Sequence, residues 1–144
     1  MPKVKDNEKL NDKISRENHF PQVAKICFGF SHLTTNNDFG LKGFENKEAY
    51  ADLIGKLVDW SGINVSEARQ RGKKLGLERI PYNQLSKPMQ GICDNSNIVS
   101  KGGKVVVFQF YNHQYRLICK EDMIHANILH VLAFDFHFLA YNHG

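Results

Sequence analysis

Side chains suited to proton transfer gather near the end of the sequence, in a polar aromatic tail that runs from residue 135 to residue 143. His137, Tyr141 and His143 lie within seven residues of one another. An imidazole changes its protonation state near neutral pH, and a phenol can both donate and accept a hydrogen bond. We therefore expect the function to involve this tail. The alternative is a simple C-terminal segment packed by Phe136, Phe138 and Leu139.

Arg116 is a cation within an apolar, β-rich run of the sequence. Because side chains alternate along a strand, Arg116 shares a face with Ile118 and lies opposite Tyr115 and Leu117. A rigid strand would hold its guanidinium in place. Two interpretations follow: a buried or interfacial ion pair, for example to Asp135, or a clamp for a phosphate. The planar fork of arginine suits a phosphate better than the ammonium of lysine does.

The histidines do not show the spacing of a metal site. His125, His130, His137 and His143 are five, seven and six residues apart, which does not place them on one face of a regular element. No pair has the short spacing typical of zinc ligands. We predict no metal and no cofactor, and we interpret His130 as a satisfied histidine in the core or at its edge.

Several common catalytic signatures are missing from the sequence. It contains no GxxxxGK[ST], GxGxxG, GxSxG or HExxH, so nucleotide phosphate loops, dinucleotide sites, α/β-hydrolases and zinc proteases lose their usual support. The three cysteines, Cys27, Cys93 and Cys119, lack CxxC spacing. We interpret them as inert thiols rather than as a nucleophile or a disulfide.

The densest group of cations comprises Arg69, Arg71, Lys73, Lys74 and Arg79. These residues lie within and just after a predicted helix, among only two acidic residues. They form either a solvated face whose cations complement the helix dipole or a surface that contacts phosphates. The formal net charge of +4 leans mildly toward a polyanionic partner.

Strand patterns occur at four places in the sequence. Residues 24–31 carry apolar side chains at period two, which predicts a first strand. Residues 105–111 and 114–120 are separated by two residues, the length of a tight hairpin. Residues 127–135 are nearly continuously apolar, which is typical of a central strand covered on both faces. In this last run, alternation predicts one face with Leu129, Val131 and Ala133 and another with Ile128, His130, Leu132 and Phe134.

Two helices are predicted between these strands. Asn46 can cap the first, and its apolar stripe comprises Tyr50, Leu53, Ile54, Leu57 and Val58. Asn64, with Glu67 three residues later, opens a second helix over residues 64–76. The two should pack as a helical hairpin.

The predicted fold is a single α+β domain over residues 21–144, a small mostly antiparallel sheet of about four strands with the helical hairpin packed on one face. Residues 81–103 contain two prolines and three glycines and are predicted as a long irregular connection, with a short edge strand at Ile98-Val99. Residues 1–20 alternate charges and are predicted as a flexible charged arm. No run reaches the roughly 20 apolar residues of a membrane span, and no signal peptide is recognised, so we expect a cytoplasmic protein without membrane contact.

The order of these elements resembles the RelE/ParE superfamily of small toxins. The matching pieces are QYRLIC, with its Tyr115-Arg116 dipeptide, then ILHVLAFD and the tail LAYNH. RNA-cleaving members of this superfamily are ribosome-dependent mRNA interferases. The chain departs from a minimal toxin in its longer N-terminal arm and its longer 81–103 connection.

The resemblance implies metal-free cleavage of RNA. The 2′-OH loses a proton as it attacks the adjacent phosphate, the phosphorane needs cationic stabilisation, and the leaving 5′-oxygen needs a proton. By resemblance, Arg116 would stabilise the phosphate, and Tyr141 and His143 would serve as base and acid or stack on a base. His137 is a further candidate because it lies in the same tail.

Two hypotheses follow. The first is a toxin-like endoribonuclease of a toxin–antitoxin system, which acts on RNA at the ribosome and whose basic surface is covered by a cognate antitoxin. The second is a non-catalytic nucleic-acid- or protein-binding module of a mobile-element or stress-response system. An enzyme should depend on Arg116 and His143, whereas a binding module should depend on Arg69, Arg71, Lys73 and Lys74.

Overall fold

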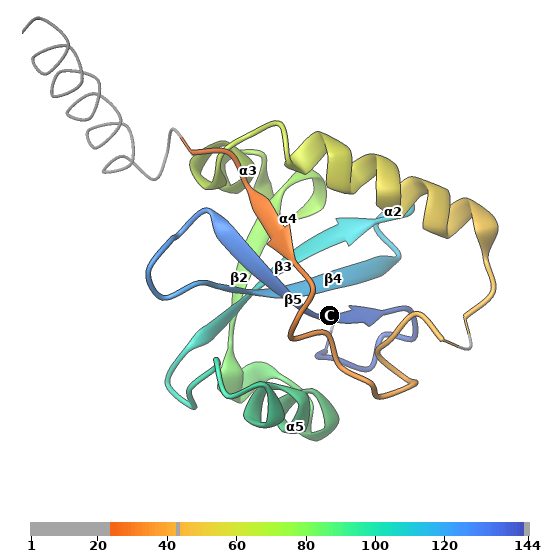
Figure 1. Cartoon of the computed structure of the whole chain (residues 1–144). Coiled ribbons are helices and arrows are strands. Elements are labelled where there is room, and N and C mark those ends of the chain that lie inside the picture. The colour runs from red at the N-terminus through yellow and green to blue at the C-terminus, as the bar shows by residue number, and fades with distance from the viewer. Residues whose placement is uncertain (1–23, 43, 143–144) are drawn as a thin grey trace, which may run out of the picture.

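The computed structural model describes residues 24–42 and 44–142 (Figure 1). The predicted N-terminal arm and His143, one of the candidate catalytic residues, lie outside the described residues. Within the described part, none of the helices combines the length and the apolar character needed to cross a membrane.

A five-stranded sheet with the order β1-β5-β4-β3-β2 forms the middle layer. The strands are β1 (Cys27–Gly29), β2 (Leu77–Pro81), β3 (Lys104–Phe110), β4 (Tyr115–Glu121) and β5 (Ile128–Asp135). β1 runs parallel to β5, and the other pairs are antiparallel. The α+β class and the mostly antiparallel sheet are therefore confirmed. The sheet has one strand more than expected. The sequence pattern did not predict β2, because this strand directly follows the basic helix and carries two charged residues of its own.

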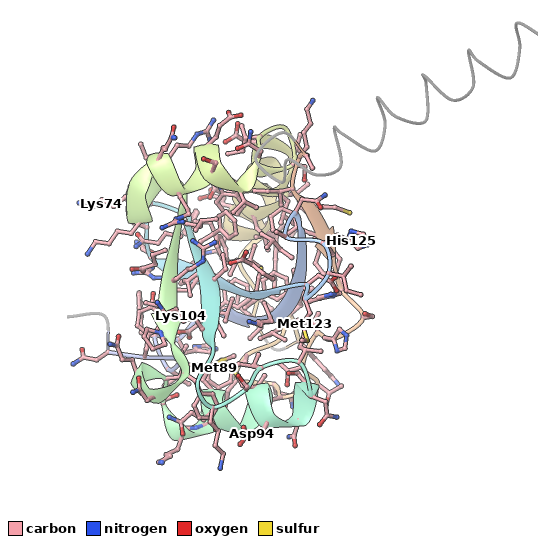
Figure 2. The ribbon with its side chains drawn as sticks, turned by 90° about the vertical axis from the view of Figure 1, so that its left-hand side faces the viewer. Lys74, Met89, Asp94, Lys104, Met123 and His125 are labelled. Carbon is pink, nitrogen blue, oxygen red and sulfur yellow. The ribbon has the colours of Figure 1, made fainter. Side chains whose placement is uncertain are left out.

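Helices cover both faces of the sheet. α2 (Lys47–Trp60), α3 (Val65–Gln70) and α4 (Gly72–Leu75) lie on one side, and α5 (Lys87–Ser96) lies on the other, after the short 3-10 turn η1 (Tyr82–Gln84). Figure 2 shows the two helical layers from the side, with Lys74 of α4 and Asp94 of α5 at opposite ends of the view. Each layer encloses its own apolar cluster against the sheet.

Two helix predictions need correction. The single helix expected over residues 64–76 breaks into α3 and α4, because Gly72, the first residue of α4, adopts a φ of +80°, outside the range of a regular helix. The irregular connection expected over residues 81–103 instead contains α5. Ser86 caps this helix by accepting a hydrogen bond from the Met89 N–H at 3.3 Å. The expected edge strand is also wrong, because Ile98 and Val99 lie in no strand and pack in the core beside α5.

The β3–β4 turn is longer than predicted. The last paired residues are Phe110 and Tyr115, so the turn has four residues rather than two. Tyr111, Asn112 and His113 all adopt left-handed backbone, with φ of 54°, 54° and 63°. This conformation is costly for a tyrosine or a histidine and persists only where the surroundings enforce it.

A bulge in β5 changes which side chains share a face. Ile118 pairs with Ala133, but the next residue, Cys119, pairs with Val131, so one extra residue is inserted in β5. The alternation predicted for this run is therefore wrong from Ala133 onward. Ala133 packs in the cluster on the α5 side, and Phe134 packs in the cluster on the α2 side. As a consequence, Asp135 lies on the α5 side of the sheet, directly beside Arg116.

Candidate functional site

Three buried polar side chains form a row across the middle of the sheet. Gln109, Arg116 and Asp135 are 7%, 8% and 0% exposed, and they are the buried polar or charged residues of the described chain. Gln109 pairs with Arg116, and Arg116 pairs with Asp135, so the row crosses β3, β4 and β5. A buried charge is costly unless hydrogen-bond partners compensate for the lost water. The row is therefore expected to be surrounded by specific polar contacts.

The guanidinium of Arg116 is fixed on two of its three nitrogens. Nε donates to the Tyr141 hydroxyl at 3.0 Å, and Nη1 donates to the carbonyl oxygens of His113 at 2.8 Å and Tyr115 at 3.3 Å. Among the described residues no hydrogen bond uses Nη2. An anion that enters the site would thus meet a preorganised cation with free N–H donors.

Asp135 organises the tail that brings Tyr141 to Arg116. Its carboxylate accepts hydrogen bonds from the backbone N–H groups of His137, Leu139 and Ala140, at 3.2, 3.0 and 3.0 Å. The tail then crosses the start of α5, where the Ser86 N–H donates to the Ala140 carbonyl at 2.7 Å. This turn and crossing hold Tyr141 over the sheet.

Tyr141 links the arginine to a carboxylate. Its hydroxyl accepts from Arg116 and donates to Glu78 Oε1 at 3.3 Å, so the three side chains form one hydrogen-bonded chain. Burial raises the pKa of Tyr141 to about 12, a shift that Arg116 opposes and Glu78 reinforces. The phenol is therefore protonated at neutral pH and can act as a proton donor.

These groups line one pocket of about 260 Å³. The pocket unites Arg116 and Tyr141 from the predicted catalytic set with Lys73 from the predicted RNA-binding set. It also contains Glu78 and Gln109, which sequence reasoning missed. Gln109 could have been noticed as a polar residue inside an apolar strand, whereas nothing in the local sequence distinguishes Glu78 from a surface glutamate.

His137, another predicted catalytic residue, does not line this pocket. His137 is exposed, and its ring lies against Phe44 with the centroids 6.0 Å apart. His143 lies outside the described residues. Within the described chain, the pocket thus contains one arginine, one lysine, one tyrosine and one glutamate as its ionisable groups.

The five predicted RNA-binding cations line three different hollows of the described surface. Arg71 is paired with Asp59 at 3.0 Å, and Arg79 is paired with Glu121 at 2.8 Å. Arg69 lines a hollow with Arg79, Lys74 lines another with Arg71, and Lys73 alone of the five lines the Arg116 pocket.

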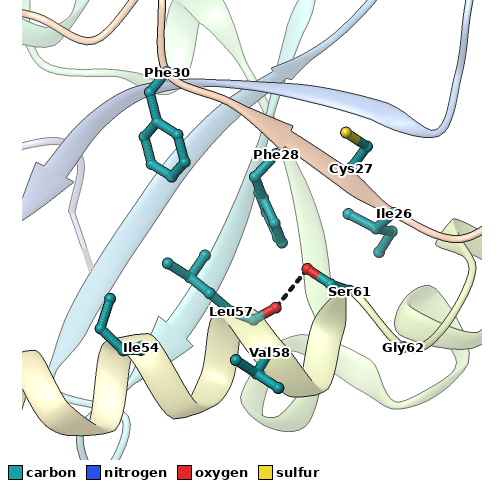
Figure 3. Close-up of a pocket in the computed structure, with 9 residues that line it drawn as sticks. All are labelled: Ile26, Cys27, Phe28, Phe30, Ile54, Leu57, Val58, Ser61 and Gly62. Atoms are coloured by element: carbon teal, nitrogen blue, oxygen red, sulfur yellow. Dashed lines mark hydrogen bonds between the residues drawn. The ribbon is translucent and has the colours of Figure 1, made fainter.

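An apolar groove of about 600 Å³ lies between β1 and α2 (Figure 3). Phe28 and Phe30 of the β1 segment face Ile54, Leu57 and Val58 of α2 across it. The Ser61 hydroxyl, at its end, donates to the Leu57 carbonyl at 2.6 Å. The groove has no acid–base pair, so it is suited to binding an apolar surface rather than to catalysis.

The remaining candidate chemistry is limited in the described chain. Burial raises the pKa of Cys93 to about 12 and raises that of Cys119 strongly as well, so both thiols stay protonated at neutral pH. Across residues 24–42 and 44–142, no three His, Cys, Asp or Glu side chains come together as a potential metal site.

No protein-family model, curated protein or solved structure gives a significant match to this chain. The function must therefore be argued from the side chains of the site itself.

Proposed function

We propose that this protein is a toxin-like endoribonuclease whose site is the Arg116 pocket. The single observation that supports this is the hydrogen-bonded chain from Arg116 through Tyr141 to Glu78, with Lys73 on the same pocket wall. Such a set supplies the three functions that RNA cleavage through the 2′-OH needs: a proton acceptor, a proton donor and cationic charge around the phosphate.

In the proposed reaction, the Glu78 carboxylate accepts the proton of the ribose 2′-OH. The 2′-oxygen forms a bond to phosphorus while the bond from phosphorus to the 5′-oxygen breaks, and Tyr141 gives its proton to that leaving oxygen. Arg116 and Lys73 stabilise the extra negative charge of the phosphorane. The products are a 2′,3′-cyclic phosphate and a 5′-hydroxyl, so atoms and charge balance without an added metal or cofactor.

The proposal includes a cognate antitoxin as protein partner. Ile54 and Val58 of α2 are 60% and 71% exposed beside the apolar groove, and β1 is an edge strand of the sheet. An amphipathic helix of the partner could cover these aliphatic side chains. Val58→Asp should then weaken antitoxin binding without altering the distant Arg116 pocket.

The second candidate is a nucleic-acid-binding module without catalysis. One observation favours it: the polar row holds backbone in place. Arg116 donates to two carbonyls at the β3–β4 turn, and Asp135 accepts from three backbone N–H groups of the tail. A row with this structural task could bind a phosphate without cleaving it.

The deciding experiment compares wild type with Glu78→Gln on a labelled RNA, with and without ribosomes. Glu78→Gln keeps the size of the side chain and a hydrogen-bond acceptor for Tyr141 but removes the base. We expect cleavage that leaves a 2′,3′-cyclic phosphate in wild type, and a rate at least about 100-fold lower in Glu78→Gln. Glu45→Gln, on an exposed loop, is the matched control.

RNA binding is measured in parallel with the same proteins. If wild type binds RNA but never cleaves it, and if binding is lost in Lys73→Ala, the binding module replaces the enzyme. Equal cleavage by wild type and Glu78→Gln would refute the role given to the carboxylate.

A further inference from the structure

A second pocket adjoins the Arg116 pocket at the open end of β3. It measures about 390 Å³ and lies between α2, α4 and the β3–β4 turn. The pairing of β2 with β3 ends at Leu77 and Phe108, so Gln109 stands beyond it and lines both pockets. Lys73 lines one pocket, and its neighbour Lys74 lines the other. A ligand bound at Arg116 could therefore extend into the second pocket.

Trp60 brings an unpartnered polar group to the lining of this second pocket. Its side chain lines the pocket and is 1% exposed. The indole Nε1 is buried and has no hydrogen-bond partner among the described residues. Buried N–H groups in proteins nearly always have a partner, so an acceptor from a ligand or an ordered water is expected here.

The rim of the pocket is held in an unusual backbone conformation. Asn112 and His113 line the pocket, and they follow Tyr111 in the left-handed turn. Two contacts enforce this turn: the Tyr111 N–H donates to Asp52 Oδ2 at 2.6 Å, and Arg116 binds the His113 carbonyl at 2.8 Å. Arg116 thus lines the Arg116 pocket and also holds the rim of the second pocket.

The character of the walls selects the class of ligand. Leu75 is exposed in the lining, beside the almost fully buried rings of Trp60 and Phe110. Asn112, His113 and Lys74 offer hydrogen-bonding groups, and the charged side chains of Asp52, Lys56, Asp59 and Arg71 complete the lining. A phosphate alone would not use the apolar walls, and an aliphatic group would leave the polar ones unpaired. A nucleobase has apolar faces and a polar edge and satisfies both.

We propose that the Trp60 pocket holds the base of the nucleotide whose phosphate binds at Arg116, and that its rim gives the protein a base preference. This inference rests on the proposed function for its ligand, RNA. It adds a recognition site to the cleavage site, with Gln109 between the two.

The test uses the indole N–H signal of Trp60 in a proton–nitrogen NMR spectrum. Trp60 is the only tryptophan of the chain, so this signal is unambiguous. The full chain is titrated with the four ribonucleoside 3′-monophosphates and, separately, with inorganic phosphate. We expect at least one nucleotide to shift the indole signal and to bind more tightly than the others, whereas inorganic phosphate should leave the signal in place.

Asn112→Gly removes a rim side chain while allowing the left-handed backbone, since glycine adopts positive φ without strain. We expect it to weaken binding of the preferred nucleotide by about 5- to 10-fold, the loss of roughly one hydrogen bond, and to leave phosphate affinity unchanged. Asn97→Gly is the matched control, because Asn97 also has a φ of 61° but ends α5 on the opposite side of the sheet.

The outcomes separate this inference from the proposed function. Nucleotide binding that shifts the indole signal, in a protein that cleaves no RNA, would support the base pocket and reject the enzyme. RNA cleavage without any indole shift or base preference would support the enzyme and overturn the base pocket. Equal nucleotide affinity in Asn112→Gly and Asn97→Gly would also overturn it.

Discussion

Replacing Tyr141 with phenylalanine tests the central contact of the site. The substitution removes one oxygen atom, which accepts from Arg116 Nε at 3.0 Å and donates to Glu78 at 3.3 Å. Because Arg116 is only 8% exposed, water has little access to replace the lost partner. The ring of the phenylalanine can still fill the space of the tyrosine ring.

The size of the effect follows from the charge of the donor. A hydrogen bond to a charged group contributes about 1.5–3 kcal/mol, and the longer bond to Glu78 adds less. We expect Tyr141→Phe to lower the free energy of unfolding by about 2 kcal/mol. For a chain of this size, that corresponds to a fall in Tm of about 4–8 °C.

Urea unfolding and thermal melting, followed by circular dichroism, would measure both quantities. The control is Tyr111→Phe, which removes an exposed hydroxyl that donates to Glu48 at 3.2 Å and should change stability by less than about 0.5 kcal/mol. If both variants had the same stability, Arg116 would not depend on the phenol, and the reasoning would be refuted. At a temperature where both are folded, RNA cleavage by Tyr141→Phe should fall by about 100- to 10,000-fold if Tyr141 is the acid.

Three further predictions concern backbone packing and pH. A Cβ at Gly76 would lie 1.8 Å from a backbone oxygen of α3, so Gly76→Ala should destabilise the fold by more than about 2 kcal/mol. Gly55 has open space around it in α2, so Gly55→Ala should stabilise the fold by about 0.5–1 kcal/mol. Urea unfolding of the two variants checks both values. Because the pKa of Tyr141 is raised from 10.0 to about 12, its contribution to stability should be complete below pH 10 and should be lost as pH rises through about 12. The alkaline unfolding curves of wild type and Tyr141→Phe should therefore differ, and identical curves would contradict this prediction. The hydrogen bond from His130, together with those from two backbone N–H groups, lowers the pKa of Asp122 from 3.8 to about 2. The contribution of Asp122 to stability should therefore be present above pH 4 and be lost as pH falls toward 2. In acid unfolding, Asp122→Asn should lack this pH-dependent loss of stability.

Elements with a strong local pattern could be predicted from the sequence. The first helix forms as expected, because Asn46 accepts the Ala49 N–H at 3.0 Å and Leu53 lies in the core. The capping box of the next helix is also present, with Asn64 accepting the Glu67 N–H at 2.8 Å. These contacts join residues only a few positions apart, so their residue types are sufficient to specify them.

Other elements gave weak or misleading patterns. Two prolines favoured a loop where α5 forms, although proline is well tolerated in the first turn of a helix and Ser86 is a good cap. The strand β2 is only five residues long and pairs on one side alone, at the edge of the sheet. Its stability comes from pairing with β3, which the local sequence does not show.

The sequence by itself determined the α+β class, the long first helix and the presence of Arg116 and Tyr141 near the end of the chain. Only the tertiary structure decided that Tyr141 links Arg116 to Glu78, which is 63 residues from Tyr141. It also decided that Lys73 lines the same pocket while His137 does not. The sequence named Asp135 as a possible partner of Arg116, but only the tertiary structure showed that the two lie side by side, because one extra residue in β5 reverses the faces that follow it. Such a shift arises from pairing between strands rather than from residue type, so periodicity along a single strand cannot reveal it.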